Sequence, residues 1–179
     1  VKSDFMVKGK LIVIDGLDGA GKATQAKLLV ERLKKEGKKV VSLDFPQYQD
    51  NFFGSLIGEC LAGKHGDFLH LSPQIASILY AGDRFEASVK IRKWLADGKY
   101  VVLDRYVSAN QIHQGGKIKE AKERKKFLQW LHTMEYEIFK IPRPDRVIFL
   151  DVTPDVTREM LTLQVNKRDK KSYLGKNAK

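Results

Sequence analysis

The chain has 179 residues, of which 42% are hydrophobic and 31% charged, proportions typical of a single globular domain. Its 33 basic and 22 acidic residues give a formal net charge of +11, which favours polyanionic partners such as nucleotides or nucleic acid. The sequence contains no apolar stretch of membrane-spanning length, no secretory signal and no cysteine besides Cys60. We therefore expect a cytoplasmic protein without a membrane partner or an internal disulfide.

Four short runs rich in Val, Ile and Leu are the predicted strands, at residues 11–15, 40–44, 100–104 and 147–151. Continuous apolar runs of this kind are typical of parallel strands that helices cover on both faces, so we expect all four to be fully buried. Helical patterns occupy residues 23–35, 53–62, 73–96 and 124–139. This alternation predicts an α/β fold, a doubly wound parallel sheet with helices on both faces in three layers.

Each predicted strand ends in an aspartate, at positions 15, 44, 104 and 151. The carboxyl ends of the strands in an open α/β sheet form the crevice in which ligands bind, so these carboxylates can belong to one site. For Asp15, Asp44 and Asp151, capping of the following turn is an equally good interpretation. Asp104 is distinguished by the arginine that follows it.

The segment between the first predicted strand and the first predicted helix, residues 16–24, reads GLDGAGKAT. A strand, a glycine-rich turn and a helix are the context of a phosphate-binding loop, because backbone N–H groups and the helix N-terminus then surround the phosphates. Lys22 supplies a positive charge for the phosphoryl group in transfer. The predicted ATP phosphate-binding residues are Gly16, Gly19, Ala20, Gly21, Lys22, Ala23 and Thr24.

Position 23 departs from the usual G-x-x-x-x-G-K-[ST] pattern, because Ala23 has no hydroxyl that could coordinate Mg²⁺. The metal would then be held by Thr24, by the nucleotide phosphates, or through water on Asp18 and Asp104. The missing hydroxyl argues against a switch GTPase, in which that ligand is central. It argues less against a small-molecule kinase, whose metal rests largely on substrate phosphates.

Three further motifs follow the phosphate loop: FPQY at residues 45–48, YAGDR at residues 80–84 and DRYVSAN at residues 104–110. Asp104 at a strand end suits a water-mediated magnesium site, and Arg105 beside it can bridge donor and acceptor phosphates. With these four motifs in order, the chain resembles the thymidylate kinase family over about residues 10–165.

The resemblance implies a P-loop nucleoside monophosphate kinase fold and transfer of the γ-phosphoryl group of ATP to dTMP, with Mg²⁺, in dTTP synthesis. It implies catalytic roles for Asp18, Lys22, Asp104 and Arg105, with Asp18 and Asp104 on the metal through water. The residues that it assigns to dTMP are Asp18, Phe45, Tyr48, Tyr80, Arg84, Arg105, Asn110 and Gln114.

Within the dTMP set, the resemblance places Tyr80 against thymine and Arg84 on a base carbonyl, and their i, i+4 spacing independently puts both on one helix face. Asn110 would read the pyrimidine edge, since an amide both donates and accepts, with Gln114 near it. His113 stands where relatives often have a tyrosine near the sugar, so it either contributes to deoxyribose selection or is structural. Core packing is the alternative role for the aromatic residues of this set.

The match to the family fades after about residue 164, and residues 164–179 are predicted to begin a lid in which Lys167 or Arg168 would replace the family's arginines. The last strand and the C-terminal helix of the family fold are not in the sequence. We therefore expect residues 1–179 to form one kinase domain without them. The resemblance also implies a homodimer.

Two alternatives to a dTMP kinase stay open. One is a related P-loop nucleoside or nucleotide kinase with another acceptor base, and the other is a basic P-loop ATPase that binds nucleic acid. Much of the positive charge lies in residues 117–126 and 167–179, but no aromatic residues alternate with these clusters, so we expect no nucleic-acid partner. No spacing of histidines and cysteines predicts a zinc site.

Overall fold

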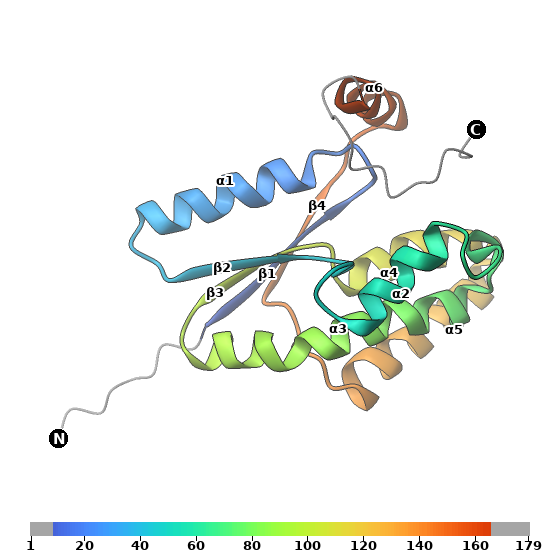
Figure 1. The fold of residues 1–179 in the computed structure, drawn as a ribbon, viewed down its shortest axis with the longest axis horizontal. Coiled ribbons are helices and arrows are strands. Elements are labelled where there is room, and N and C mark those ends of the chain that lie inside the picture. Colours follow the sequence, from blue (N-terminus) through green and yellow to red (C-terminus); the bar gives the residue numbers. More distant parts are fainter. Residues whose placement is uncertain (1–8, 166–179) are drawn as a thin grey trace.

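The computed structural model describes residues 9–165, and its centre is a four-stranded parallel sheet (Figure 1). The strands are β1 (Lys10–Gly16), β2 (Val40–Asp44), β3 (Tyr100–Asp104) and β4 (Arg146–Leu150), in the order β2-β3-β1-β4. The predictions of strands at 40–44 and 100–104 are confirmed at both ends. The other two predicted strands each differ from β1 and β4 by one residue at each end.

Helices connect and flank these strands. The predicted bounds are confirmed for α3 (Pro73–Ala96), whereas the predicted helix 124–139 divides into α5 (Ala121–His132) and a π-helical turn (Thr133–Ile138). The short helix α4 (Val107–His113) has no counterpart among the predicted helices. The remaining elements are α1 (Lys22–Lys35), α2 (Phe52–Leu61), α6 (Pro154–Val165) and 3₁₀ turns at Phe68–His70 and Gly115–Lys117. Across residues 9–165, every helix is too short or too polar to cross a membrane.

The sheet packs between two hydrophobic cores, which confirms the predicted α/β fold in three layers. Successive side chains of a strand point to opposite faces of the sheet. Accordingly, Leu11 and Val13 of β1 face the core that α3 and α5 complete, while Ile14 of β1 and Val102 of β3 face the core beneath α1. Figure 1 shows α1 on one side of the sheet and α3 with α5 on the other.

The two edge strands are not fully buried, and the prediction of full burial is wrong for them. In β4, Val147, Ile148 and Phe149 are 48%, 43% and 48% exposed, and β2 is half-buried to exposed. An edge strand has a hydrogen-bonded neighbour on one side only, and the two cores of the described chain centre on β1 and β3. An apolar run therefore indicates a strand, but how far the strand is buried depends on which elements lie beside it.

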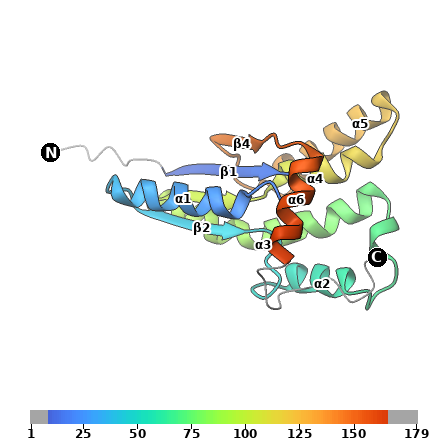
Figure 2. The same ribbon diagram turned by 90° about the horizontal axis from the view of Figure 1, so that it is seen from above.

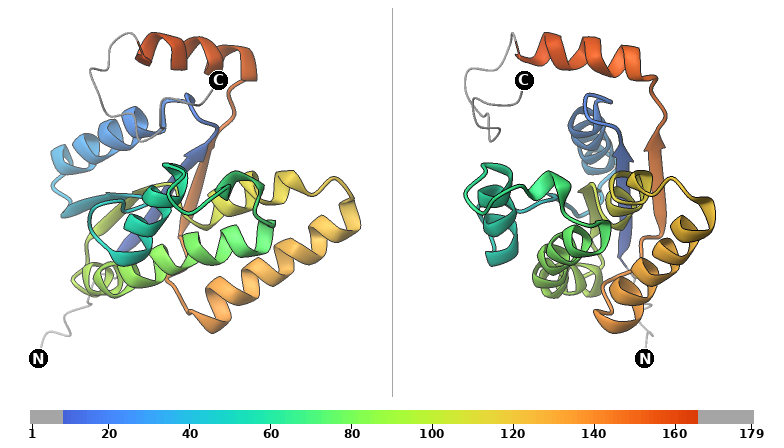
Figure 3. Two further views of the ribbon diagram at one scale, coloured as in Figure 1. Left: turned by 45° about the vertical axis from the view of Figure 1, so that its right-hand side comes forward. Right: turned by 90° about the vertical axis from the view of Figure 1, so that its right-hand side faces the viewer.

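Helix α6 follows β4 and runs across the carboxyl edge of the sheet, beside the turn after β1 (Figures 2 and 3). Gly19 is the point of contact. Its φ is +83°, and a Cβ there would lie 2.5 Å from the carbonyl oxygen of Thr157 and 2.8 Å from Leu161 Cγ. The predicted lid, 164–179, overlaps only the end of α6, and its candidate cations Lys167 and Arg168 lie outside the described residues.

Gly54 in the first turn of α2 packs against the loop after β2, and we expect Gly54→Ala to destabilise the protein by about 1–3 kcal/mol. The new Cβ would lie 2.0 Å from the carbonyl oxygen of Gln47 and 2.4 Å from its carbonyl carbon, and backbone atoms cannot rotate away. Urea unfolding measures the effect.

The control for this prediction is Gly116→Ala, because Gly116 is exposed and a Cβ at this position would have no heavy atom of another residue of the described chain within 4 Å. We expect Gly116→Ala to change the free energy of unfolding by less than about 0.5 kcal/mol. Equal unfolding midpoints for the two variants would contradict the proposed contact.

Candidate active site

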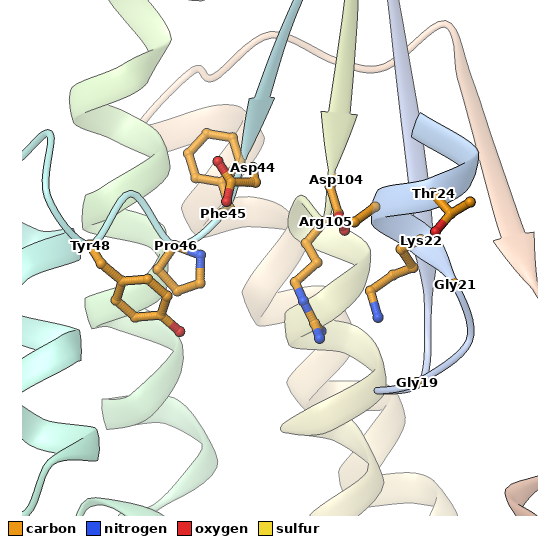
Figure 4. Close-up of a pocket in the computed structure, with 11 residues that line it drawn as sticks. Gly19, Gly21, Lys22, Thr24, Asp44, Phe45, Pro46, Tyr48, Asp104 and Arg105 are labelled. Atoms are coloured by element: carbon orange, nitrogen blue, oxygen red, sulfur yellow. The ribbon is translucent and has the colours of Figure 1, made fainter. Parts of the chain in front are cut away.

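A cavity of about 280 Å³ opens where β1, β2 and β3 end, between the turn after β1 and the segment after β2 (Figure 4). This is the crevice expected from the parallel sheet. Figure 4 shows Arg105 extending from the end of β3, with Lys22 on one side and Tyr48 on the other. The cavity is lined by Gly19, Gly21, Lys22, Ala23, Thr24, Asp44, Phe45, Pro46, Tyr48, Asp104 and Arg105.

The phosphate loop is anchored from below by Asp15, which is fully buried. Its Oδ1 accepts a hydrogen bond from the Gly16 N–H at 2.9 Å, and its Oδ2 accepts one from Ser108 Oγ at 2.6 Å. Asp15 is therefore structural, as the capping interpretation predicts. Gly16 and Ala20 shape the loop but do not line the cavity.

The N-terminus of α1 faces the cavity through Gly21, its N-cap residue, whose φ is +86°. No side chain of the described residues caps this end of the helix. The first N–H groups of a helix have no partner within the helix, so an uncapped N-terminus beside a cation is a ready anion site. The arrangement is the one that a phosphate loop requires.

Lys22 is the cation of this loop and is only 6% exposed. Its Nζ donates to the carbonyl oxygen of Leu17 at 2.8 Å and lies 3.8 Å from Asp18 Oδ1. Burial, followed by the charge of Arg105, lowers the pKa of Lys22, and the carboxylates of Asp18 and Asp104 oppose this effect. Phosphate groups in the cavity would favour the charged ammonium further.

Arg105 joins the phosphate loop to the end of β3. Its backbone adopts φ +68°, and its N–H donates to the carbonyl oxygen of Ile14 at 2.9 Å. Its guanidinium pairs with Asp18, and its Nη1 lies 3.0 Å from Nε2 of His113. Because a guanidinium can only donate, Nε2 of His113 is the acceptor and the imidazole is neutral.

The histidine itself is held neutral by its surroundings. Burial lowers the pKa of His113 most, and the positive charge of Arg105 lowers it next. The carboxylate of Asp18 acts in the opposite direction. His113 thus contacts the predicted catalytic arginine directly, which fits a structural role. Selection of deoxyribose by His113 stays a prediction.

Asp18 and Asp104, the predicted water-mediated metal ligands, have opposite pKa shifts. Burial acts to raise the pKa of Asp18, but Arg105 and Lys22 outweigh it and the pKa is lowered. Burial raises the pKa of Asp104 against the effect of Lys22 and Arg105. Oδ1 of Asp104 is buried, and among residues 9–165 it has no hydrogen-bond partner.

An unpartnered buried oxygen beside a phosphate cavity fits a water molecule or a metal-bound water. The described chain holds no cluster of three or more His, Cys, Asp or Glu side chains that could coordinate a metal by themselves. A divalent cation here would therefore depend on substrate phosphates and water, as the replacement of the loop hydroxyl by Ala23 predicts.

The predicted acceptor residues fall into two groups. Phe45 and Tyr48 line the cavity, and the ring of Phe45 also packs at 5.8 Å on that of Tyr106. Tyr80 lies on α3, half-buried, with its ring 6.0 Å from that of Phe68, and burial followed by the charge of Tyr48 raises its pKa to about 12. The cavity is not lined by Tyr80, Arg84, Asn110 or Gln114.

Arg84 is 2% exposed and forms an ion pair with Glu135, which is fully buried. The Arg84 Nε donates to Glu135 Oε2 at 2.9 Å, its Nη2 donates to Oε1, and its Nη1 donates to the carbonyl oxygen of Tyr106 at 3.4 Å. Glu135 was not among the predicted site residues. Its signal in the sequence is a carboxylate one turn after Leu131 and two turns after Phe127, on an apolar helix face.

The thymidylate kinase family model matches residues 14–174 of the chain. The chain is 32% identical over 149 residues to the thymidylate kinase of Mycobacterium tuberculosis, covering 83% of this chain and 69% of that protein. It is 39% identical over 146 residues to a probable thymidylate kinase of Thermococcus onnurineus, covering 79% and 65%. The structure of thymidylate kinase from Candida albicans superposes with a TM-score of 0.69 at 28% identity, covering 85% of this chain and 67% of that one.

The parallel sheet, the phosphate loop and the arginine at the end of β3 together define a P-loop nucleoside monophosphate kinase. The chain belongs to the thymidylate kinase family, transferases that phosphorylate dTMP with ATP. The family and enzyme class predicted from the sequence are confirmed. The chain spans 65–69% of the length of the relatives described above.

The contact between Arg105 and His113 predicts that Arg105→Gln raises the pKa of His113, because the largest charge that lowers this pKa is removed while burial remains. Nuclear magnetic resonance titration of the His113 ring protons measures the pKa, and a His113→Gln variant identifies the signal.

Lys10→Gln is the control for this titration. It removes the same charge at the opposite end of β1, where Lys10 pairs with Asp145, and we expect no change in the pKa of His113. A His113 pKa that stays the same or falls in Arg105→Gln would contradict the electrostatic contact.

Proposed function

We propose that this chain transfers the γ-phosphoryl group of ATP to the phosphate of dTMP at the cavity between the phosphate loop and residues 44–48. An oxygen of the dTMP phosphate forms a bond to the γ-phosphorus, the bond from that phosphorus to the β–γ bridging oxygen breaks, and ADP leaves. The observation that carries this proposal is the position of Arg105, whose guanidinium pairs with Asp18 of the loop and which lines the same cavity as Phe45 and Tyr48.

On the donor side, the loop N–H groups and the N-terminus of α1 would hold the ATP phosphates. The predicted donor residues Gly19, Gly21, Lys22, Ala23 and Thr24 all line the cavity. The buried ammonium of Lys22 is in place to follow the γ-phosphoryl group, and Arg105 to neutralise charge on the oxygens that share it. Positioning and electrostatic stabilisation account for most catalysis of phosphoryl transfer, so these two cations are the proposed catalytic groups.

Mg²⁺ is the proposed cofactor, and the residues present fit it. Asp104 offers an unpartnered carboxylate oxygen, and Asp18 carries a lowered pKa, so both can hold waters of a hydrated ion. When bound, the ion would neutralise charge on the transferring phosphates. The protein's own contribution is to orient its water shell.

On the acceptor side, Phe45 and Tyr48 would contact dTMP first, since both line the cavity. Tyr80, Arg84, Asn110 and Gln114 are proposed to receive the base. Tyr80 and Arg84 stand one turn apart on α3, with Tyr80 half-buried and Arg84 buried. A homodimer, which the family resemblance implies, and a cytoplasmic location, which the sequence led us to expect, remain part of this proposal.

Acceptor specificity tests the proposal. We expect coupled ADP-release assays with dTMP, dUMP, dCMP, AMP and GMP to give the highest kcat/KM for dTMP, and calorimetry to show the tightest binding for the same nucleotide. Activity confined to another acceptor would contradict the proposal and favour a kinase for a different base. ATP hydrolysis without any acceptor, with tight salt-dependent binding of DNA, would instead favour a nucleic-acid ATPase.

Asp104→Asn tests the cofactor. The amide keeps the shape of the carboxylate but loses its charge, so we expect the Mg²⁺ concentration for half-maximal activity to rise about tenfold or more. Activity at saturating Mg²⁺ should recover in part, because the phosphates hold the metal. Asp97→Asn, at the exposed end of α3, is the matched control. An unchanged Mg²⁺ requirement in Asp104→Asn would contradict the assignment.

A further inference from the structure

A buried polar cluster lies between α3, α4 and the π-helical turn, next to the aromatic residues of the acceptor side. Its side chains are all at least nine-tenths buried. It adjoins the cavity through Tyr106, which follows Arg105 in the chain, packs on Phe45 and accepts from Arg84. The polar cluster consists of Ser77, Arg84, Asn110 and Glu135, together with Gln114 one turn after Asn110 at the end of α4.

Glu135 sets the orientation of Arg84. Its two oxygens accept from Nε and Nη2 of the arginine, a bidentate arrangement that fixes the plane of the guanidinium. After the bond from Nη1 to Tyr106, one hydrogen on Nη1 and one on Nη2 have no acceptor among the described residues. A guanidinium carries no acceptor, so Arg84 can offer a ligand only hydrogen-bond donors.

Glu135 also sets the orientation of Asn110. The amide Nδ2 donates to the carbonyl oxygen of Ser77 at 3.2 Å and to Glu135 Oε1 at 3.5 Å, which uses both of its hydrogens. The reverse orientation would place Oδ1 of Asn110 against a carboxylate, with two acceptors facing each other. In the described chain nothing donates to Oδ1, so Asn110 can offer a ligand only an acceptor.

Two further oxygens show that the polar cluster is incomplete by itself. Ser77 Oγ and Gln114 Oε1 are buried, and neither has a hydrogen-bond partner in residues 9–165. A buried polar atom without a partner costs about 1–3 kcal/mol, so native proteins rarely keep several in one place without a function. A ligand with its own polar edge would supply the missing partners.

We infer that Glu135 is the positioning residue that makes this site select 4-oxo over 4-amino pyrimidine nucleotides. This inference rests on the proposed function and adds the origin of its base selectivity. Glu135 fixes the direction of the Arg84 donors and leaves Asn110 with an acceptor to offer. That pair matches a pyrimidine with a carbonyl at C4 and an N–H at N3, and cytosine, with an amino group at C4 and an unprotonated N3, mismatches both.

The selectivity between dTMP and dCMP tests this inference. Glu135→Gln keeps the shape of the side chain, but its amide leaves Arg84 with one acceptor and can present a donor to Asn110. We expect the ratio of kcat/KM for dTMP to that for dCMP to fall at least about tenfold, mainly through a higher KM for dTMP. In the wild type, cytosine is rejected because it leaves buried polar groups of the site unpaired, and the variant weakens this discrimination.

A matched substrate separates selectivity from general damage. Uracil has the same C4 carbonyl and N3–H as thymine, so the ratio of kcat/KM for dTMP to that for dUMP should change less than about threefold in Glu135→Gln. Ser88→Ala is the matched variant. Ser88 is fully buried on α3 and accepts from Arg92, outside the polar cluster, and its loss should leave the dTMP to dCMP ratio unchanged.

Glu135→Asp provides a second variant that keeps the negative charge beside Arg84 and therefore guards against loss of folding. Its shorter side chain reaches fewer of the partners, so we expect a smaller fall in the dTMP to dCMP ratio. Thermal unfolding of each variant, with and without dTMP, checks that the protein is folded.

The inference would be overturned if both folded variants keep the wild-type ratio, or if kcat/KM falls equally for dTMP and dCMP, because Glu135 would then be only structural. The proposed function fails separately, if the wild-type chain neither binds nor phosphorylates dTMP.

Discussion

The register between β1 and β3 is the constraint on which the whole site depends. Ile14 of β1 pairs with Asp104, the last residue of β3, and β1 ends only two residues further on, at Gly16. The phosphate loop and Arg105 therefore leave the sheet side by side, and a backbone hydrogen bond of 2.9 Å from Arg105 to Ile14 continues the pairing one residue beyond β3. A shift of one residue would turn the alternate side chains of β3 to the opposite face. The pairing of β1 with β3 thus also sets the relative positions of the phosphate loop and Arg105.

Two ion pairs in this molecule differ in what surrounds them, and the difference divides their roles. Arg105 and Asp18 meet at the cavity, where Asp18 is mainly exposed to solvent. Arg84 and Glu135 meet in the interior, where neither charge reaches water. An exposed pair costs little to rearrange, whereas breaking a buried one leaves an uncompensated charge. The first pair can therefore rearrange easily, whereas the second holds a fixed shape.

The elements that the sequence predicts well are those with strong local signals. β3 and α3 have their predicted bounds because a continuous apolar run and a Ser-Pro helix start mark them. The phosphate loop is readable because glycines and Lys22 are adjacent in the chain. The burial of β4 cannot be predicted in this way, because it depends on which other elements pack against the strand.

Site residues that depend on long-range packing escape prediction from the sequence. Glu135 meets Arg84 across 51 positions, so only the packing of the π-helical turn against α3 brings them together. Asp15 and Asp104 both end predicted strands, and for Asp15 the sequence alone leaves the choice between structural anchor and ligand open. The structure decides for Asp15 because Ser108, from the otherwise unpredicted α4, satisfies its second oxygen.

Gly19 shows how two distant segments can restrict one position. Its positive φ already disfavours any other residue, and the Thr157 carbonyl of α6 occupies the space in which a side chain would begin. Relief of the backbone strain alone would therefore not make the position tolerant, because α6 would also have to move. The requirement for glycine at position 19 of the phosphate loop therefore depends partly on α6, a helix that begins 135 residues later.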